Sequence, residues 1–139
     1  MRRLLSLLFA LAAAGCAEAP SPSPPAAGFT TGVTREGGYT VGWRVAGAAR
    51  PPFNRHFELE VRVERDGAPV EGAQVFARAD MPGHGHGMQT EPRSRELGAG
   101  EYLVAGMLMH MTGHWVLSID VITGGTAHTV DFDLAVELD

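Results

Sequence analysis

The sequence has very little cysteine: Cys16 is the only one, so the chain cannot form an internal disulfide. The stability of its folded part must therefore come from a packed core. Long apolar runs are also missing. The run from Leu4 to Ala14 is too short for a membrane span, which needs about 20 residues. No window has the periodicity of an amphipathic helix, which argues against a helical fold.

Positive charge is scarce too, and the formal net charge is −5. Without a basic patch or an array of stacking aromatic residues, we expect no nucleic-acid partner. Catalytic groups are equally sparse. Beyond Cys16 there is no thiol, the serines fall in Pro-rich or strand-like positions, and no pair of carboxylates stands near the histidines. The nearest carboxylate is Asp80, which could orient a histidine instead. We therefore expect a protein that is not an enzyme.

The N-terminus has the order of a targeting segment. Arg2 and Arg3 precede the apolar run, and small residues lead directly to Cys16. The order Leu-Ala-Ala-Ala-Gly-Cys resembles the lipobox of bacterial lipoproteins, which implies cleavage before Cys16 and attachment of lipid to its sulfur. The alternative is an ordinary signal peptide with a free thiol nearby.

The chain then divides into three parts. Residues 1–15 are expected to be a lipoprotein signal peptide, and residues 16–28 are the lipidated cysteine and a tether rich in Pro, Ser and Ala. Residues 29–139 form one folded domain. A lipid on Cys16 would anchor this domain to a membrane of the bacterial cell envelope, facing the periplasm.

From Gly28 onward, apolar residues alternate with polar ones, and Gly and Pro punctuate the pattern. Asp66-Gly67 has the composition of a tight hairpin turn. We predict an all-β fold, an immunoglobulin-like β-sandwich of about seven strands. The predicted strands cover residues 39–45, 57–64, 70–81, 90–97, 101–105, 114–121 and 128–138.

Two loops between these strands combine histidine and methionine. The first, Met81–Met88, places His84 and His86 between glycines after Pro82 and ends on Met88, so it is neither strand nor helix. The second, Met107–His114, repeats the same two side-chain types. Thioether and imidazole together suit copper better than magnesium or calcium, which prefer oxygen ligands.

We predict a copper ion bound between the loops, if the strand topology brings them to one end of the sandwich. Other interpretations stay open. Methionine is also a common filler of cores, His110 could join the ligands or point to water, and two loop histidines with His110 or His114 could form a zinc site. The predicted copper ligands are His84, His86, Met88, Met109, Met111 and His114.

Several motifs together resemble the YtkA-like family, which is related to FixH-type accessory domains. They are the strand Gly67–Val75, the loop Met81–Met88, the Gly-x-Tyr of Gly100–Tyr102 and the Gly-x-Trp of Met111–Leu117. Thr112 stands where many relatives have proline. The resemblance implies a small envelope β-sandwich, often tied to metal or oxidase biology, with no general assigned activity.

Two functional hypotheses follow. The first is a lipid-anchored envelope protein that binds copper as a chaperone, a buffer or an assembly factor for a metalloenzyme. The second is a metal-free interaction module that serves as an accessory to a membrane complex. The expected partners are the membrane, through the lipid on Cys16, and a metalloprotein or membrane complex.

Overall fold

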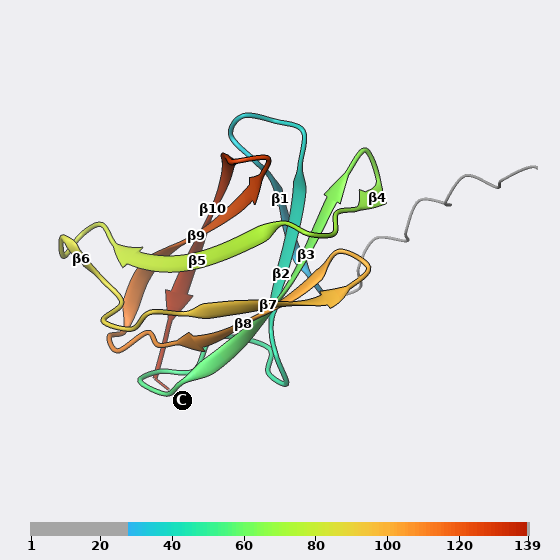
Figure 1. Ribbon diagram of the computed structural model, residues 1–139. Coiled ribbons are helices and arrows are strands. Elements are labelled where there is room, and N and C mark those ends of the chain that lie inside the picture. Colours follow the sequence, from blue (N-terminus) through green and yellow to red (C-terminus); the bar gives the residue numbers. More distant parts are fainter. Residues whose placement is uncertain (1–27, 139) are drawn as a thin grey trace, which may run out of the picture.

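The predicted β-sandwich is confirmed by the computed structural model, which describes residues 28–138 (Figure 1). The predicted signal peptide and nearly all of the predicted tether lie outside the described residues. Within residues 28–138 there is no helix, and hence none that could cross a membrane. The strands are β1 (Thr30–Val33), β2 (Thr40–Val45), β3 (Phe57–Arg65), β4 (Ala68–Pro69), β5 (Gln74–Met81), β6 (His86–Gly87), β7 (Arg93–Gly98), β8 (Glu101–Met107), β9 (Gly113–Thr123) and β10 (Thr126–Val136).

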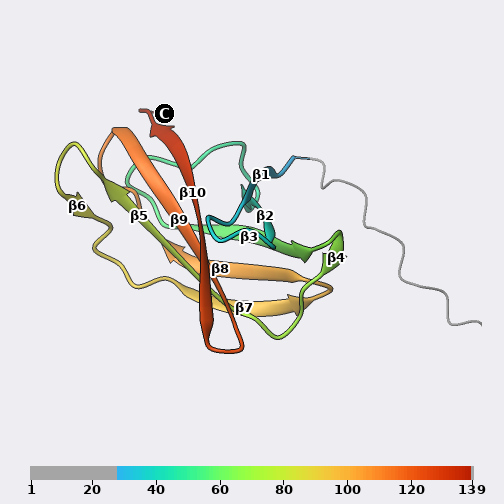
Figure 2. The ribbon, with the colours of Figure 1, turned by 90° about the horizontal axis from the view of Figure 1, so that it is seen from above.

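The strands form two antiparallel sheets that face each other (Figure 2). One sheet has the order β1-β2-β3-β8-β7, and the short β4 pairs with β3. The other has the order β10-β9-β5-β6. The chain passes between the sheets after β3–β4, after β6 and after β8. The first histidine and methionine loop is therefore a hairpin that leads into one of these connections, and the second loop is itself a connection between the sheets.

The alternating pattern determines which side chains fill the core. In β3 the apolar residues at alternate positions from Phe57 to Val63 are buried, and in β9 those from Trp115 to Val121 are buried. The predicted inward faces of these strands are confirmed. The hairpin turn at Asp66-Gly67 is also confirmed, because both residues have the positive φ values (52° and 77°) that a tight turn of this kind requires.

Other details differ from the prediction. The strands β1, β4 and β6 were not predicted, since β4 and β6 have two residues each and β1 is largely exposed. The strand predicted from residue 70 begins at Gln74. Leu138 was predicted to point inward, but β10 ends at Val136 and Leu138 is 69% exposed. The last ladder pair of β10 is Val136 with Gly113, and beyond it no strand pairing fixes the direction of successive side chains.

The topology brings the two predicted loops together. Since β5 pairs antiparallel with β9, the end of β5 lies beside the start of β9. The loop around β6 and the β8–β9 connection consequently meet at one end of the sandwich, as both views show (Figures 1 and 2). We call this end, made of residues 82–92 and 108–112, the histidine end.

Candidate metal centre

The first loop is closed by a tight turn at the end of β5. The backbone N–H groups of His84 and Gly85 both donate to the carbonyl oxygen of Met81, each at 3.0 Å, and Gly85 takes a φ of 67° that favours glycine. The chain returns as β6, where His86 pairs with Met81. Directly opposite residues of an antiparallel pair share a face. His86 is therefore on the inward side with buried Met81, at the edge of the sheet.

The second loop is fastened on both sides of His110. The carbonyl oxygen of Met109 accepts a hydrogen bond from the N–H of Asn54 at 2.9 Å. The carbonyl oxygen of Met111 accepts one from the indole Nε1–H of Trp115, also at 2.9 Å. Because the peptide groups before and after it are held, His110 occupies a defined place between the sheets.

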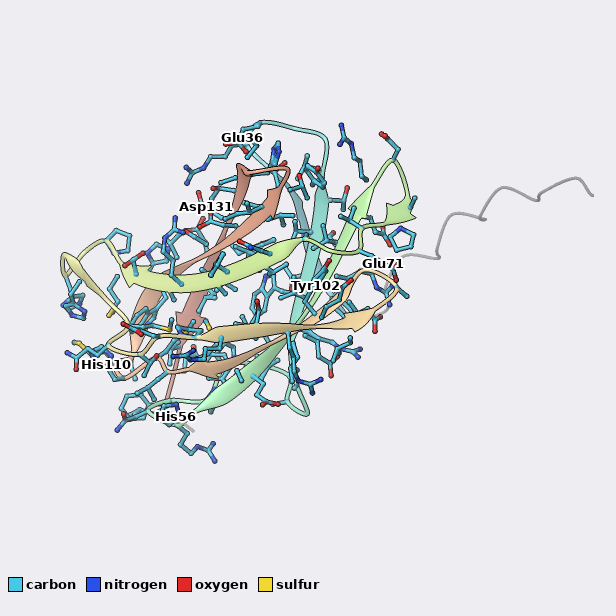
Figure 3. All side chains as sticks on the ribbon, viewed as in Figure 1. Glu36, His56, Glu71, Tyr102, His110 and Asp131 are labelled. Atoms are coloured by element: carbon cyan, nitrogen blue, oxygen red, sulfur yellow. The ribbon has the colours of Figure 1, made fainter. Side chains whose placement is uncertain are left out.

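These loops place three imidazoles in a row that ends on a tryptophan. The ring centroids of His84 and His86 are 5.7 Å apart, and those of His86 and His110 are 5.4 Å apart. The rings of His110 and Trp115 are nearly perpendicular, with centroids 5.7 Å apart. Trp115 is fully buried and forms the floor of the row. Figure 3 shows His110 at the histidine end, with sulfur atoms close by. We call His84, His86 and His110 the histidine row.

All of the methionines from residue 28 to residue 138 belong to this end of the sandwich, but they occupy two environments. Met81, Met107 and Met109 are fully buried in the core. For Met109, a predicted ligand, the structure thus matches the alternative that it is a core residue. Met88 and Met111, also predicted ligands, are partly buried and pack against the core from its rim. These two methionines lie in the same two loops as the histidine row.

The structure does not bring His114 to the row. It precedes buried Trp115 in β9 and so lies on the outer face of the sheet, where its side chain is 57% exposed. Its Nε2 lies 2.7 Å from Oδ1 of Asp133 on β10. Asp80, considered as a carboxylate that orients a histidine, is also on an outer face and contacts Gly87.

The histidine row fits some metal sites and not others. An imidazole nitrogen binds a metal at about 2 Å, so two rings that share one ion have centroids up to about 6 Å apart. Both neighbouring pairs of the row are within this reach. In residues 28–138, however, no three His, Cys, Asp or Glu side chains converge as a metal site. The arrangement favours two imidazoles completed by thioethers, and it does not favour the zinc alternative with three such ligands.

One buried polar atom of the row lacks a hydrogen-bond partner among the described residues. It is the Nδ1 of His110. A buried polar atom without a partner costs stability, so native structures usually supply a partner, a water or an ion. The sequence alone left open whether His110 is a ligand or points to water. Its position between Met109 and Met111 was the only sign that it belongs to the site. The roles of Trp115 and Asn54 in holding it had no signal in the sequence.

Comparisons with known proteins agree with the fold. The profile of a family described as YtkA-like matches residues 49–120, which include both loops. Among solved structures, the chain is similar to a DUF4426 family protein from Pseudomonas aeruginosa PAO1, with 24% identity and a TM-score of 0.55. The match covers 78% of this chain and 98% of that one, and it supports the fold alone. A search of curated proteins gave no match.

Proposed function

This chain belongs to the YtkA-like family, and we propose that it binds one copper ion at the histidine row as an envelope copper chaperone, buffer or metalloenzyme-assembly factor. The family description names no activity, and neither does that of the DUF4426 neighbour. The proposal therefore depends on the residues of this chain. It assigns the protein a binding role and no catalysis.

The observation that carries the proposal is the environment of His110. Its buried Nδ1 lacks a partner among the described residues, while its ring stacks on the exposed ring of His86. A copper ion bound by the two imidazoles would take the place of the hydrogen-bond partner that Nδ1 of His110 lacks. Met88 and Met111 are the thioethers available to complete the set.

The ligand types favour Cu(I). Thioethers are soft ligands that select Cu(I), and imidazole accepts copper in either oxidation state. Thiolates would offer stronger binding, but the described residues contain none. A set of imidazoles and thioethers also resists the oxidation that inactivates thiolates in an oxidising compartment.

The placement of the row suits an ion that is passed on. His84 and His86 are exposed, so one side of the site is open to a partner. His110 and its methionine neighbours provide the fixed side. An ion held between a fixed wall and two exposed side chains can be exchanged without unfolding the domain. This is what a chaperone, buffer or assembly factor requires.

The experiment is an anaerobic Cu(I) titration of the full-length chain in detergent, in competition with a chromogenic Cu(I) chelator. We expect one tight equivalent, and a loss of affinity in His86→Ala and in His110→Ala. His114→Ala is the matched control, because it removes an imidazole from the same end that faces away from the row. Binding that is unchanged by the first two variants, or no uptake in competition, would refute the proposal.

A further inference from the structure

One side of the sandwich has two strand edges without a neighbour. β7 is the last strand of its sheet. In the other sheet, β6 pairs only with Asp80 and Met81, so the rest of β5 also lacks a neighbour on this side. β5 and β7 lie close to each other across the opening. A groove of about 580 Å³ runs between them.

The lining of this groove combines apolar residues with polar ones, among them Glu91 and Glu96. Tyr102 forms part of the lining, and its hydroxyl is already engaged because it donates to the carbonyl oxygen of Val70 at 2.7 Å. Pro92 and Ala73 add apolar surface. Phe76, on β5, is 50% exposed at the rim, which is unusual for so large an apolar side chain. The groove thus offers apolar contacts to a chain lying beside β7.

The two faces of β7 differ in chemistry. Ser94 and Glu96 are paired with buried Val104 and Tyr102, so they are on the side of the groove. Arg93 and Arg95 alternate with them and lie on the outer face of the sheet. A strand added at this edge would therefore place one row of its side chains in the groove and the other row beside two arginines.

These arginines have no ion-pair partner among residues 28–138, in contrast to most arginines of the domain. Arg35, Arg44, Arg50, Arg62 and Arg78 each contact a carboxylate. Arg93 and Arg95 are exposed, adjacent on one face and of one sign. Two unpaired guanidinium groups at this spacing are complementary to carboxylates that recur at every second residue of an extended chain.

We propose that β7 captures an extended acidic peptide of a partner protein as an added strand. The backbone of the peptide pairs with the edge of β7, its acidic side chains contact Arg93 and Arg95, and its alternate apolar side chains fill the groove against Tyr102 and Phe76. This mode of recognition obtains affinity from main-chain hydrogen bonds and specificity from the alternating side chains. The inference does not depend on copper.

The probe is a dye-labelled synthetic peptide of alternating glutamate and valine, about nine residues long to match a strand of ordinary length. Binding to the full-length chain in detergent is followed by fluorescence anisotropy, and the site is mapped by amide NMR shifts. We expect shifts in β7 and along the groove. The double variant Arg93→Glu/Arg95→Glu should weaken binding about tenfold, and added salt should weaken it as well.

Controls separate strand pairing from charge alone. Arg50→Glu reverses one charge in the β2–β3 loop, half of the change made by the double variant, and should leave binding unchanged. The double variant should instead bind a peptide of alternating lysine and valine. Methylating alternate amides of the peptide should abolish binding in one of the two possible frames and spare it in the other, because only one set of amides faces β7.

Three results would overturn the proposal. They are no binding of the acidic peptide, equal binding of the acidic and lysine peptides to the unsubstituted chain, or equal binding of both methylated frames. In the first case the arginines would serve only as charges that protect an edge strand from aggregation.

Discussion

The imidazole of His86 stacks on that of His110, with ring centroids 5.4 Å apart and ring planes inclined by 29°. One ring comes from the β5–β6 hairpin and the other from the connection between β8 and β9. The contact therefore exists only when both loops are held in place. The residues that hold the two loops therefore determine whether the site forms.

Gly87 should be required for the position of His86. A Cβ at residue 87 would collide with the carboxylate of Asp80 and would lie 2.9 Å from the carbonyl oxygen of Ala79. Gly87→Ala should shift β6 and displace His86 while leaving both imidazoles in the chain. We expect Cu(I) affinity to fall about tenfold or more, as for other changes that misplace a ligand, measured by chelator competition.

Gly83→Ala is the matched control for this change. Gly83 lies in the same turn, and a Cβ there would meet nothing within 4 Å. Its affinity should match that of the unsubstituted chain. If Gly87→Ala and Gly83→Ala bind copper equally well, the pairing of β5 with β6 does not position the site.

Trp115 should stabilise the domain partly through its hydrogen bond. Trp115→Phe removes the donor to the Met111 carbonyl and leaves a small void in a fully buried position. We expect a loss of about 2 kcal/mol in the free energy of unfolding, from the hydrogen bond and the cavity together. Urea unfolding monitored by circular dichroism would measure it.

Trp43→Phe provides the comparison. Trp43 is also buried, but its Nε1 has no hydrogen-bond partner among the described residues. This substitution removes a donor that forms no bond, so it should cost less than Trp115→Phe. An equal or larger loss for Trp43→Phe would show that the hydrogen bond to Met111 contributes little.

Asp131 should make the domain sensitive to acid. Burial acts to raise the pKa of Asp131, but hydrogen bonds from Arg35 and Ser118 outweigh it and hold this pKa below its ordinary value. A carboxylate with a lowered pKa stabilises the folded state above its unfolded pKa of about 4 and loses this effect as the pH falls through the folded value. The stability of the chain should therefore decline below about pH 4.

Asp131→Asn should lower stability at neutral pH and flatten the decline in acid, and Ser118→Ala, which removes one of the two donors, should give an intermediate slope. Urea midpoints measured across the acidic range would show the difference. An unchanged slope in Asp131→Asn would mean that other carboxylates determine the response to acid.

The identities of most strands could be predicted from the sequence because their apolar residues alternate without interruption. In β3 and β9 the pattern extends over the whole strand, and burial follows it. The short strands β4 and β6 are too brief to show a pattern, and they exist because β3 and β5 offer a neighbouring edge. Pairing with the preceding strand across a tight turn formed them, and a two-residue segment has no pattern that could reveal this pairing.

The candidate site was only partly predictable for the same reason. The two loops could be recognised by composition, but their meeting depended on the pairing of β5 with β9. His110 and His114 have similar surroundings in the sequence. His114 follows the strict alternation of β9 and faces outward, whereas His110 lies in an irregular connection whose direction is fixed by the hydrogen bonds of Met109 and Met111.

The lipid anchor remains a prediction on Cys16, which is outside the described residues. In a bacterial host fed an alkyne-labelled fatty acid, the full-length chain should incorporate the label and Cys16→Ser should not. Inhibition of lipoprotein signal peptidase should also leave the unprocessed precursor. An unlabelled, processed protein would favour the alternative of an ordinary signal peptide with a free thiol.

We expect copper to bind between the two loops with imidazole and thioether ligands. X-ray absorption at the copper edge, on the full-length chain loaded with one equivalent of Cu(I), would identify these ligands. The spectrum should show both nitrogen and sulfur neighbours, loss of sulfur when Met88 and Met111 are changed to Leu, and fewer imidazoles in His110→Ala. A copper ion with only nitrogen and oxygen neighbours, unaffected by these changes, would contradict this expectation.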